Sequence, residues 1–302
     1  MIVKEFPNPQ IILNLKNIPD QENPKHIKWP NVIVTAKTKR FDKYAPESSF
    51  TVITNTQGTS HVEMGERKVN VCEQLFFIIN PYQSFQYNIH SEQHVQTFNI
   101  HYDYSTFQQI THSLVNDDDL LLTHQDTISS TYYFNNQLHY KDLPFRDLIS
   151  QFTHEEEDVF LLDLLQYLIG KEKKTLQKIT RINASRQSVR QELFQRMLMA
   201  KDYIYGNYHL QEFSIDDLCK ELAMSKFHFL RIFRDFFGSS PYQFLKMVRM
   251  EQARYLLEGT DLPVNEIAYQ IGYEEANSFY PAFKSIYHKS PNNYRKIAIL
   301  NS

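Results

Sequence analysis

The strongest constraint on the fold is an internal repeat in the C-terminal third of the chain. The segment FRDFFGSSP begins at Phe233 and the related segment FKSIYHKSP begins at Phe283, an offset of 50 residues. Upstream, LCKELA from Leu218 aligns with IAYQIG from Ile267 at an offset of 49, so the second copy has one more residue in its turn. Each copy predicts a short helix, a tight turn and a second helix that ends before Ser-Pro, which is the order of a helix-turn-helix unit.

Start and stop signals for helices are dense in this region. Ser214 begins the run SIDD, a capping-box-like start in which the aspartates favour the positive end of the helix dipole. Pro241 and Pro291 each follow a serine, an order typical of an N-cap and a first helical residue. Gly238 indicates a left-handed helix end, and Pro263 opens another helix. Between the two copies, residues 242–258 are expected to form a long connecting helix.

Helical spacing divides the second helix of the first copy into two faces. One face is an apolar stripe for the core, made of Phe229, Ile232, Phe233 and Phe236. The other face has the same spacing two residues earlier and consists of Phe227, Leu230, Arg231 and Arg234. Two residues correspond to roughly 200° of rotation around a helix, so this second set faces away from the core. Phe227 and Leu230 also fit a wider core, and Arg234 also fits a solvated surface charge.

The second copy repeats this division with one departure. Its inward set is Phe279, Ala282, Phe283 and Ile286, and its outward set is Asn277, Tyr280, Pro281 and Lys284. Proline is tolerated only in the first turn of a helix. We therefore expect this helix to begin late, near Asn277 or Ser278, or to be kinked. His288 takes the place that Gly238 holds in the first copy, which predicts a mildly strained left-handed histidine.

From roughly Met197 to Arg295, the chain resembles the DNA-binding region of the AraC/XylS family of transcription regulators. The resemblance rests on the combined order of Ala223, Ser225, Phe233, Gly238, Arg249, Ala253, Leu257, Ile267, Ala268, Gly272, Tyr273, Phe279, Phe283, Lys284, Pro291, Tyr294 and Arg295. It implies two helix-turn-helix units on one rigid connecting helix. Their reading helices would enter successive segments of the major groove, about 34 Å apart.

The resemblance also implies which residues contact DNA. Arg231 would offer a bidentate donor pair to guanine, while Phe227 and Leu230 suit thymine methyl groups. Ser225 and Lys226 fit phosphate contacts. The complete predicted set is Ser225, Lys226, Phe227, Leu230, Arg231, Arg234, Asn277, Tyr280 and Lys284, with base reading by the second unit resting on Asn277 and Tyr280.

The first third of the chain is rich in short runs typical of β-strands. The runs are 31–39, 49–54, 59–64, 67–72, 75–80, 84–89 and 94–101, and turn-type residues such as Ser91-Glu92 separate them. Their close spacing indicates an antiparallel barrel or sandwich, and their order resembles the cupin-type barrel that accompanies this DNA-binding region. Residues 158–169 then predict an amphipathic helix carrying Val159, Leu162, Leu165 and Ile169. This helix would pack against its own copy in a dimer or against the barrel.

We therefore predict an α+β fold in three parts. Residues 1–135 form a cupin-like antiparallel β-barrel and residues 136–188 a helical linker or dimerisation region. Residues 189–302 form an all-α domain in which a long helix joins two helix-turn-helix units.

Three functions compete for the predicted barrel. A sensor would bind a small-molecule effector among the strand aromatics Tyr82, Phe85, Tyr87, Phe98 and Tyr102. An interaction module would have a filled interior and serve dimerisation. A cupin enzyme would need a metal, but the glycine- and glutamate-containing cupin motif is missing. In addition, His94 and His101, near His90, point to opposite faces of an extended strand. We favour the sensor and predict no catalytic residue, no metal and no cofactor.

Composition bounds these predictions. The 302 residues, 42% hydrophobic and 22% charged, are enough for two globular domains. Two distant cysteines, no export signal and no apolar run near the roughly 18 residues of a membrane span predict a cytoplasmic protein. The net charge of −3 is unfavourable for DNA binding, but binding depends on the local electrostatic field of one face rather than on the total charge.

The expected partners are a double-stranded DNA operator, RNA polymerase, a small-molecule effector and a second copy of the chain. The sequence leaves open the operator, the effector and whether the protein activates or represses.

Overall fold

The structure is a computed structural model that describes residues 2–3, 31–65, 67–115, 132–184 and 186–300. The chain divides into two compact units, Met1–Leu176 and Gln177–Ser302. This division precedes the predicted boundary at residues 188 and 189. Most of the predicted helical region 136–188 therefore belongs to the first unit.

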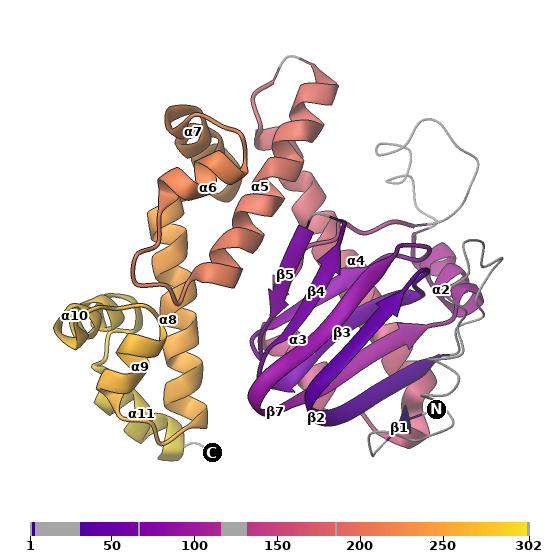
Figure 1. Ribbon diagram of the computed structural model, residues 1–302, viewed down its shortest axis with the longest axis horizontal. Coiled ribbons are helices and arrows are strands. Elements are labelled where there is room, and N and C mark those ends of the chain that lie inside the picture. The colour runs from indigo at the N-terminus through magenta and orange to yellow at the C-terminus, as the bar shows by residue number, and fades with distance from the viewer. Residues whose placement is uncertain (1, 4–30, 66, 116–131, 185, 301–302) are drawn as a thin grey trace. The chain divides into compact units, whose positions relative to one another are not determined.

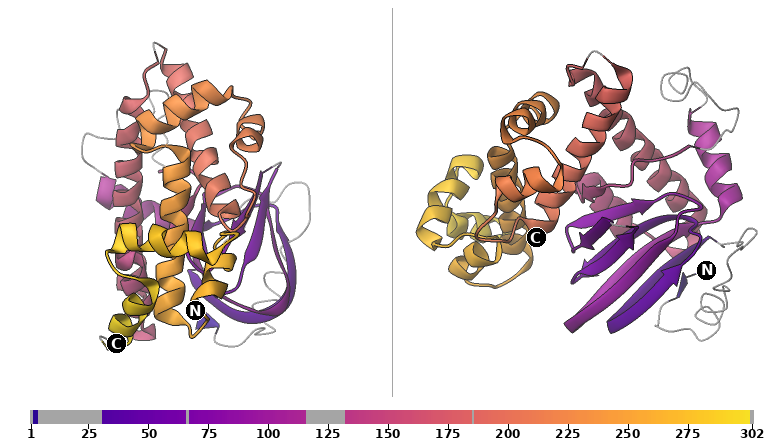
Figure 2. Two further views of the ribbon diagram at one scale, coloured as in Figure 1. Left: turned by 90° about the vertical axis from the view of Figure 1, so that its left-hand side faces the viewer. Right: turned by 45° about the horizontal axis from the view of Figure 1, so that its top comes forward.

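The first unit is built on one curved, mainly antiparallel sheet that forms a near-closed barrel (Figures 1 and 2). Its strands are β1 (Ile2–Val3), β2 (Val32–Ala45), β3 (Phe50–Gln57), β4 (Ser60–Met64), β5 (Arg67–Val71), β6 (Leu75–Ile79), β7 (Phe85–Tyr102) and β8 (Leu138–Tyr140). The strand order is β1-β2-β7-β3-β6-β8, and β4 pairs with both β5 and β7. The predicted barrel is confirmed.

The single long strand β7 replaces two strands that the sequence predicts separately. The chain stays extended across Ser91 and Glu92, where we predicted a turn. β2 pairs with β7 on both sides of an irregularity between Thr38 and Arg40, so the turn-type residues form a bulge instead. The first half of β7 also pairs with β4 and the second half with β3. These partners on both edges hold the whole strand extended.

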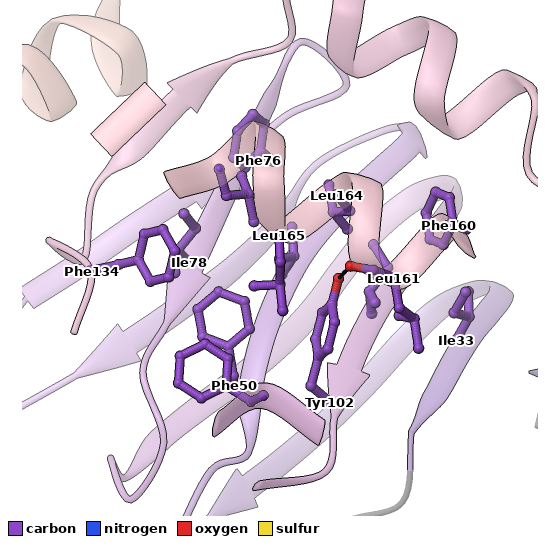
Figure 3. Close-up of a cluster of buried hydrophobic side chains, with 14 of the residues drawn as sticks. Ile33, Phe50, Phe76, Ile78, Tyr102, Phe134, Phe160, Leu161, Leu164 and Leu165 are labelled. Carbon is purple, nitrogen blue, oxygen red and sulfur yellow. Dashed lines mark hydrogen bonds between the residues drawn. The ribbon is translucent and has the colours of Figure 1, made fainter. Parts of the chain in front are cut away.

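Three helices cover one face of the sheet: α2 (Tyr104–Val115), α3 (Leu143–Ser150) and α4 (Glu157–Leu176). The largest apolar cluster of this unit lies between them and the sheet (Figure 3). Phe50 stacks on Phe107 of α2, with ring centroids 4.4 Å apart. The Tyr102 hydroxyl donates to the Leu161 carbonyl of α4 at 2.9 Å, which satisfies a polar group inside the cluster.

The packing of α4 differs from the predicted stripe. Leu165 and Ile169 are buried as predicted, but Val159 and Leu162 are exposed. The buried face of α4 consists of Phe160, Leu161, Leu164, Leu165, Leu168, Ile169 and Glu172. A run this rich in apolar residues fits more than one stripe, and the sheet selects one. The sequence left open whether this helix packs against its own copy in a dimer or against the barrel. The buried face of α4 packs against the barrel.

The second unit is entirely helical in its described part. After the short 3-10 helix η3 (Gln177–Arg181), its helices are α5 (Gln187–Asn207), α6 (Ile215–Glu221), α7 (Lys226–Phe237), α8 (Pro241–Gly259), α9 (Val264–Gln270), α10 (Ala276–Tyr287) and α11 (Pro291–Leu300). The predicted signals are confirmed. The Ser214 side chain caps α6, Ser240 and Gln243 form a capping box on α8, and Gly238 ends α7 with φ +77°.

The start of α10 corrects one expectation. The helix begins at Ala276, which is buried, and Glu275 is its N-cap residue. Pro281 is thus the sixth residue of α10 and lies in the second turn, so the helix does not begin late as the first alternative predicted. The second alternative, a kink at Pro281, stays a prediction. The buried methyl group of Ala276 fixes an earlier start than the proline alone indicates. His288 ends the helix in the left-handed conformation with φ +58°, as expected.

Candidate nucleic-acid interface

The helix α7 has one buried face and one exposed face, as its spacing predicts. Its inward residues Phe229, Ile232, Phe233 and Phe236 are at most 2% exposed. On the opposite side, Phe227 is 81% exposed, and Arg231 and Arg234 are exposed as well. Leu230 is half-buried at the edge. The exposure of Phe227 excludes it from the core.

Charged and aromatic side chains gather at the amino end of α7. Ser225 is the N-cap residue, and its side chain makes no capping bond. The Lys226 ammonium group lies 3.0 Å from the Asp216 carboxylate of α6. This hydrogen bond raises the pKa of Lys226, and the Tyr242 phenol adds a smaller effect. Tyr242, in the first turn of α8 and 55% exposed, therefore belongs to the same surface. Tyr242 is not among the DNA contacts predicted from the sequence, although its place just after Ser-Pro was a usable signal.

The exposed face of α10 carries fewer hydrogen-bond donors than the exposed face of α7, because it has no arginine. Asn277, Pro281 and Lys284 are exposed, as the outward set predicts. Tyr280 is half-buried against the core of the second copy, and its hydroxyl donates to Asn265 Oδ1 of α9 at 3.2 Å. The structure therefore places Tyr280 at the edge of this face, with its hydroxyl directed toward α9.

The tight turns of the two copies share one backbone feature. Ala223 in the first turn has φ +48°, and Gly272, its counterpart in the second, has φ +88°. Arg249 of α8 binds the segment that follows α5, because its guanidinium group donates to the carbonyls of Tyr208 (2.8 Å) and Leu210 (2.7 Å). The same group lies over the Tyr273 ring. The two reading helices are thus mounted on one frame built from α5 and α8.

Charge is distributed unevenly between the two units. Residues 177–302 contain 17 lysines and arginines against 13 aspartates and glutamates, a net charge of +4. Residues 1–176 contain 15 against 22, a net charge of −7. The overall value of −3 therefore hides a basic unit. The electrostatic field of this basic unit favours binding of a polyanion such as DNA. The negative net charge of the whole chain comes from the acidic N-terminal unit.

The aromatic residues predicted to bind an effector do not lie on one surface. Phe98 and Tyr102 pack in the cluster under α4. Phe85 and Tyr87 are buried elsewhere, and the Tyr87 ring contacts Phe41. Tyr82 is 41% exposed, has φ +64° and packs against Tyr104.

The three neighbouring histidines are also separated. The Nε2 atom of His90 lies 2.8 Å from the Asp42 carboxylate at the surface, and His94 is exposed. His101 Nδ1 lies 3.0 Å from the Thr51 hydroxyl, and burial lowers the pKa of His101 to about 4. Among the residues that the structure describes, no group of three or more His, Cys, Asp or Glu side chains is placed to hold a metal ion. In the same residues, no helix is both long and apolar enough to span a membrane.

Two helix-turn-helix copies, each with an exposed helix face on a basic unit, are typical of a DNA-binding domain. Residues 218–297 match the family model of a helix-turn-helix domain. The chain is 38% identical over 85 residues to an uncharacterized helix-turn-helix transcriptional regulator of Haemophilus influenzae (28% of each chain). It is 32% identical over 96 residues to the Msm operon regulatory protein of Streptococcus mutans (32% of this chain, 34% of the relative). It is also similar to the solved C-terminal domain of AraT, a response regulator from Geobacillus stearothermophilus (31% identity, 34% of this chain, 84% of that chain, TM-score 0.33).

The C-terminal unit is a helix-turn-helix domain of the AraC/XylS type. The matched segment spans only 28–34% of the length of these two curated relatives. Both relatives are regulators by name.

Proposed function

We propose that this chain is a sequence-specific DNA-binding regulator of transcription, in which α7 and α10 read successive segments of the major groove. The observation that carries the proposal is the exposed face of α7. Arg231 and Arg234 lie there beside Phe227, and within the described part of the chain neither arginine has an ion-pair or hydrogen-bond partner. Two unpaired guanidinium groups next to an exposed phenyl ring match guanine acceptors and a thymine methyl group.

The basic charge of the C-terminal unit supports the same proposal. Phosphate contacts supply most of the affinity of a DNA-binding protein and fix its register, while contacts to base edges supply specificity. Lys226 and Ser225 at the amino end of α7 are placed for phosphate. The surface pair of Lys226 with Asp216 is weak enough to exchange for a phosphate oxygen.

The test is selection of sites from a random duplex library by the full-length chain, followed by affinity measurements on the selected site. We expect an asymmetric site with two blocks about one helical turn apart. Arg231→Ala should lower the preference for guanine in one block by roughly 5- to 150-fold, the worth of one bidentate contact of about 1–3 kcal/mol.

Two control variants sharpen this test. Arg234→Ala should weaken binding to all sequences and reduce its salt dependence if it contacts phosphate. Lys174→Ala removes an exposed cation from the N-terminal unit and should leave the site unchanged. An Arg231→Ala protein with normal circular dichroism and an unaltered site preference would refute the assignment of α7 as the reading helix.

The proposal extends to an effector held by the N-terminal barrel. On the face of the sheet opposite the α4 cluster, polar side chains such as Thr51, Thr97 and Asn99 are buried, and Thr51 and Asn99 form hydrogen bonds within the barrel. The buried Tyr87 hydroxyl has no hydrogen-bond partner of good geometry, although Asn99 and Ser60 lie close enough to oppose the rise in its pKa. A polar small molecule bound beside Tyr87 would satisfy this hydroxyl. Thermal shift of the full-length chain against a panel of sugars and carboxylates tests this part of the proposal, and no shift with any member would favour the interaction-module alternative.

A second copy of the chain and RNA polymerase complete the proposed partners. Val159 and Leu162 form an exposed apolar pair on α4 and are candidates for a dimer contact. Sedimentation of the wild-type chain and of a Val159→Glu, Leu162→Glu variant would separate a dimer through this face from a monomer. In vitro transcription from a promoter carrying the selected site would show whether bound protein activates or represses the polymerase.

A further inference from the structure

The two reading faces can be compared position by position, because the repeat aligns them at a constant offset of 50 residues. The exposed positions pair as Phe227 with Asn277, Arg231 with Pro281, Arg234 with Lys284, and Gly238 with His288. The central position of the face, where α7 carries the arginine assigned to guanine, is therefore a proline in α10. The two copies share a backbone plan but present different chemistry to a partner.

Pro281 changes the surface of α10 in two ways. The residue is exposed in the second turn, so its ring is an apolar surface available to a partner. Proline has no N–H group, so the Asn277 carbonyl one turn earlier loses its helical donor. The exposed face thus gains an apolar patch and an unpaired carbonyl acceptor, and it lacks the guanidinium donors of Arg231.

Around Pro281, no guanidinium group replaces the two-pronged donor that Arg231 offers to guanine. The Tyr280 hydroxyl is directed to Asn265. Lys284 provides a single charge rather than a bidentate fork. At the amino end of α10, Glu275 and Ala276 stand where α7 has Ser225 and Lys226. The face is therefore poorly suited to guanine, which offers only the acceptors N7 and O6 in the major groove.

An A·T base pair presents the complementary pattern. Thymine offers its 5-methyl group and adenine offers the N6 amine with N7 beside it. The Asn277 amide can bond adenine N6 and N7, its freed backbone carbonyl can accept from an amine, and the Pro281 ring can cover a methyl group. Residues 277 and 281 are four positions apart, about 6 Å along the helix, which is less than two base-pair steps of about 3.4 Å.

We propose that Pro281 is a specificity determinant that makes the two units read different half-sites. The helix α7 reads a block that contains guanine, and α10 reads an A·T block in which Pro281 contacts a thymine methyl group next to the adenine bound by Asn277. This inference rests on the proposed function, because it assigns base classes to the two reading helices.

The experiment uses the full-length chain and its selected site. Each thymine of the second block is replaced in turn by uracil, which removes only the methyl group. We expect one replacement to weaken wild-type binding about fourfold, the effect of one buried methyl-sized group. For Pro281→Ala, thymine and uracil at that position should bind equally. Replacements in the first block serve as the control, since their effects should be the same in both proteins.

A second variant tests the same assignment in the opposite direction. Pro281→Arg restores the residue type found at position 231, and repeat selection should then enrich guanine in the second block. The inference is overturned if the wild-type second block contains guanine at its centre or is not enriched, or if Pro281→Ala leaves the uracil effect unchanged. Enrichment of the first block in those cases leaves the proposed function standing, whereas no enriched site at all overturns both.

Discussion

The ends of the two reading helices show what a single residue contributes. Gly238 and His288 occupy equivalent positions and both adopt the left-handed conformation, with φ +77° and φ +58°. Each donates its N–H group to the carbonyl four residues earlier, at 2.8 and 2.9 Å. Glycine reaches this conformation without a steric cost, whereas a side chain costs roughly 1–2 kcal/mol. The second copy therefore retains a strain that the first copy avoids.

Exchanging these residues should move stability in opposite directions. His288→Gly should stabilise the helical unit by about 0.5–1 kcal/mol, because relief of strain exceeds the extra entropy that glycine has in the unfolded chain. Gly238→His should destabilise it by a similar amount, since a Cβ atom at Gly238 meets nothing within 4 Å and the penalty is purely conformational. Urea unfolding followed by far-ultraviolet circular dichroism measures both changes. Destabilisation by His288→Gly would mean that the histidine side chain makes a contact worth more than its strain.

At the scale of elements, the second copy is tied to the connecting helix more tightly than its sequence indicates. A Cβ atom on Gly272 would lie 2.7 Å from a guanidinium nitrogen of Arg249 and 2.8 Å from the Tyr208 carbonyl oxygen. The glycine thus lets the turn of the second unit approach α8 and the end of α5. Arg254 of α8 adds a further anchor, because it pairs with Glu251 and Glu258, which accept from Tyr287 and Tyr294.

Gly272→Ala should consequently destabilise the C-terminal unit by more than about 2 kcal/mol, from backbone strain and steric overlap together. The matched control is Ala223→Gly at the equivalent turn of the first copy. There the native alanine already has φ +48°, so glycine should be neutral or slightly stabilising. Calorimetry of both variants provides the comparison. Equal effects at the two turns would show that the close approach of Arg249 to Gly272 is unimportant.

At the scale of the whole molecule, the chain separates a basic, helical unit from an acidic unit with a sheet at its centre. In the acidic unit, burial favours the neutral forms of two titratable groups. Burial lowers the pKa of His101 to about 4 and that of Lys141 to about 7. The Lys141 ammonium nitrogen lies 2.6 Å from the Asn55 carbonyl oxygen, so the neutral amine still donates a hydrogen bond there.

These shifts predict that the stability of the N-terminal unit rises with pH. Between pH 6.5 and 4 the unfolded chain binds a proton at His101 that the folded chain excludes, so the free energy of unfolding falls as pH decreases, by about 3 kcal/mol. Lys141 adds a second rise between about pH 7 and 10.4, because within this window the unfolded chain binds a proton at Lys141 that the folded chain excludes. Thermal unfolding of wild type and His101→Gln across pH 4 to 7 tests the first window. An identical pH slope in both proteins would contradict the assignment to His101.

Much of the C-terminal unit was predictable because its signals are local. Ser214, Ser240 and Gly238 act on the backbone within four residues, so their roles follow from chain chemistry alone. The same holds for the two faces of α7, since a helical period of 3.6 residues separates Arg231 from Phe233 whatever else the chain does. The exposed residues of the candidate interface were therefore largely identified from the sequence, and the structure added Tyr242 to that surface.

The remaining features depended on distant partners, which only the tertiary structure provides. Ser91 and Glu92 have turn-type chemistry, but pairing with β2 keeps β7 extended through them. The apolar run of α4 fits several stripes, and the sheet buries the one that leaves Val159 exposed. The sequence by itself determined the repeated helix-turn-helix plan and its reading face, because caps and helical period act within a turn or two. The tertiary structure decided strand continuity, the buried face of α4 and the second-turn position of Pro281, because packing between segments far apart in the chain outweighs local preference there.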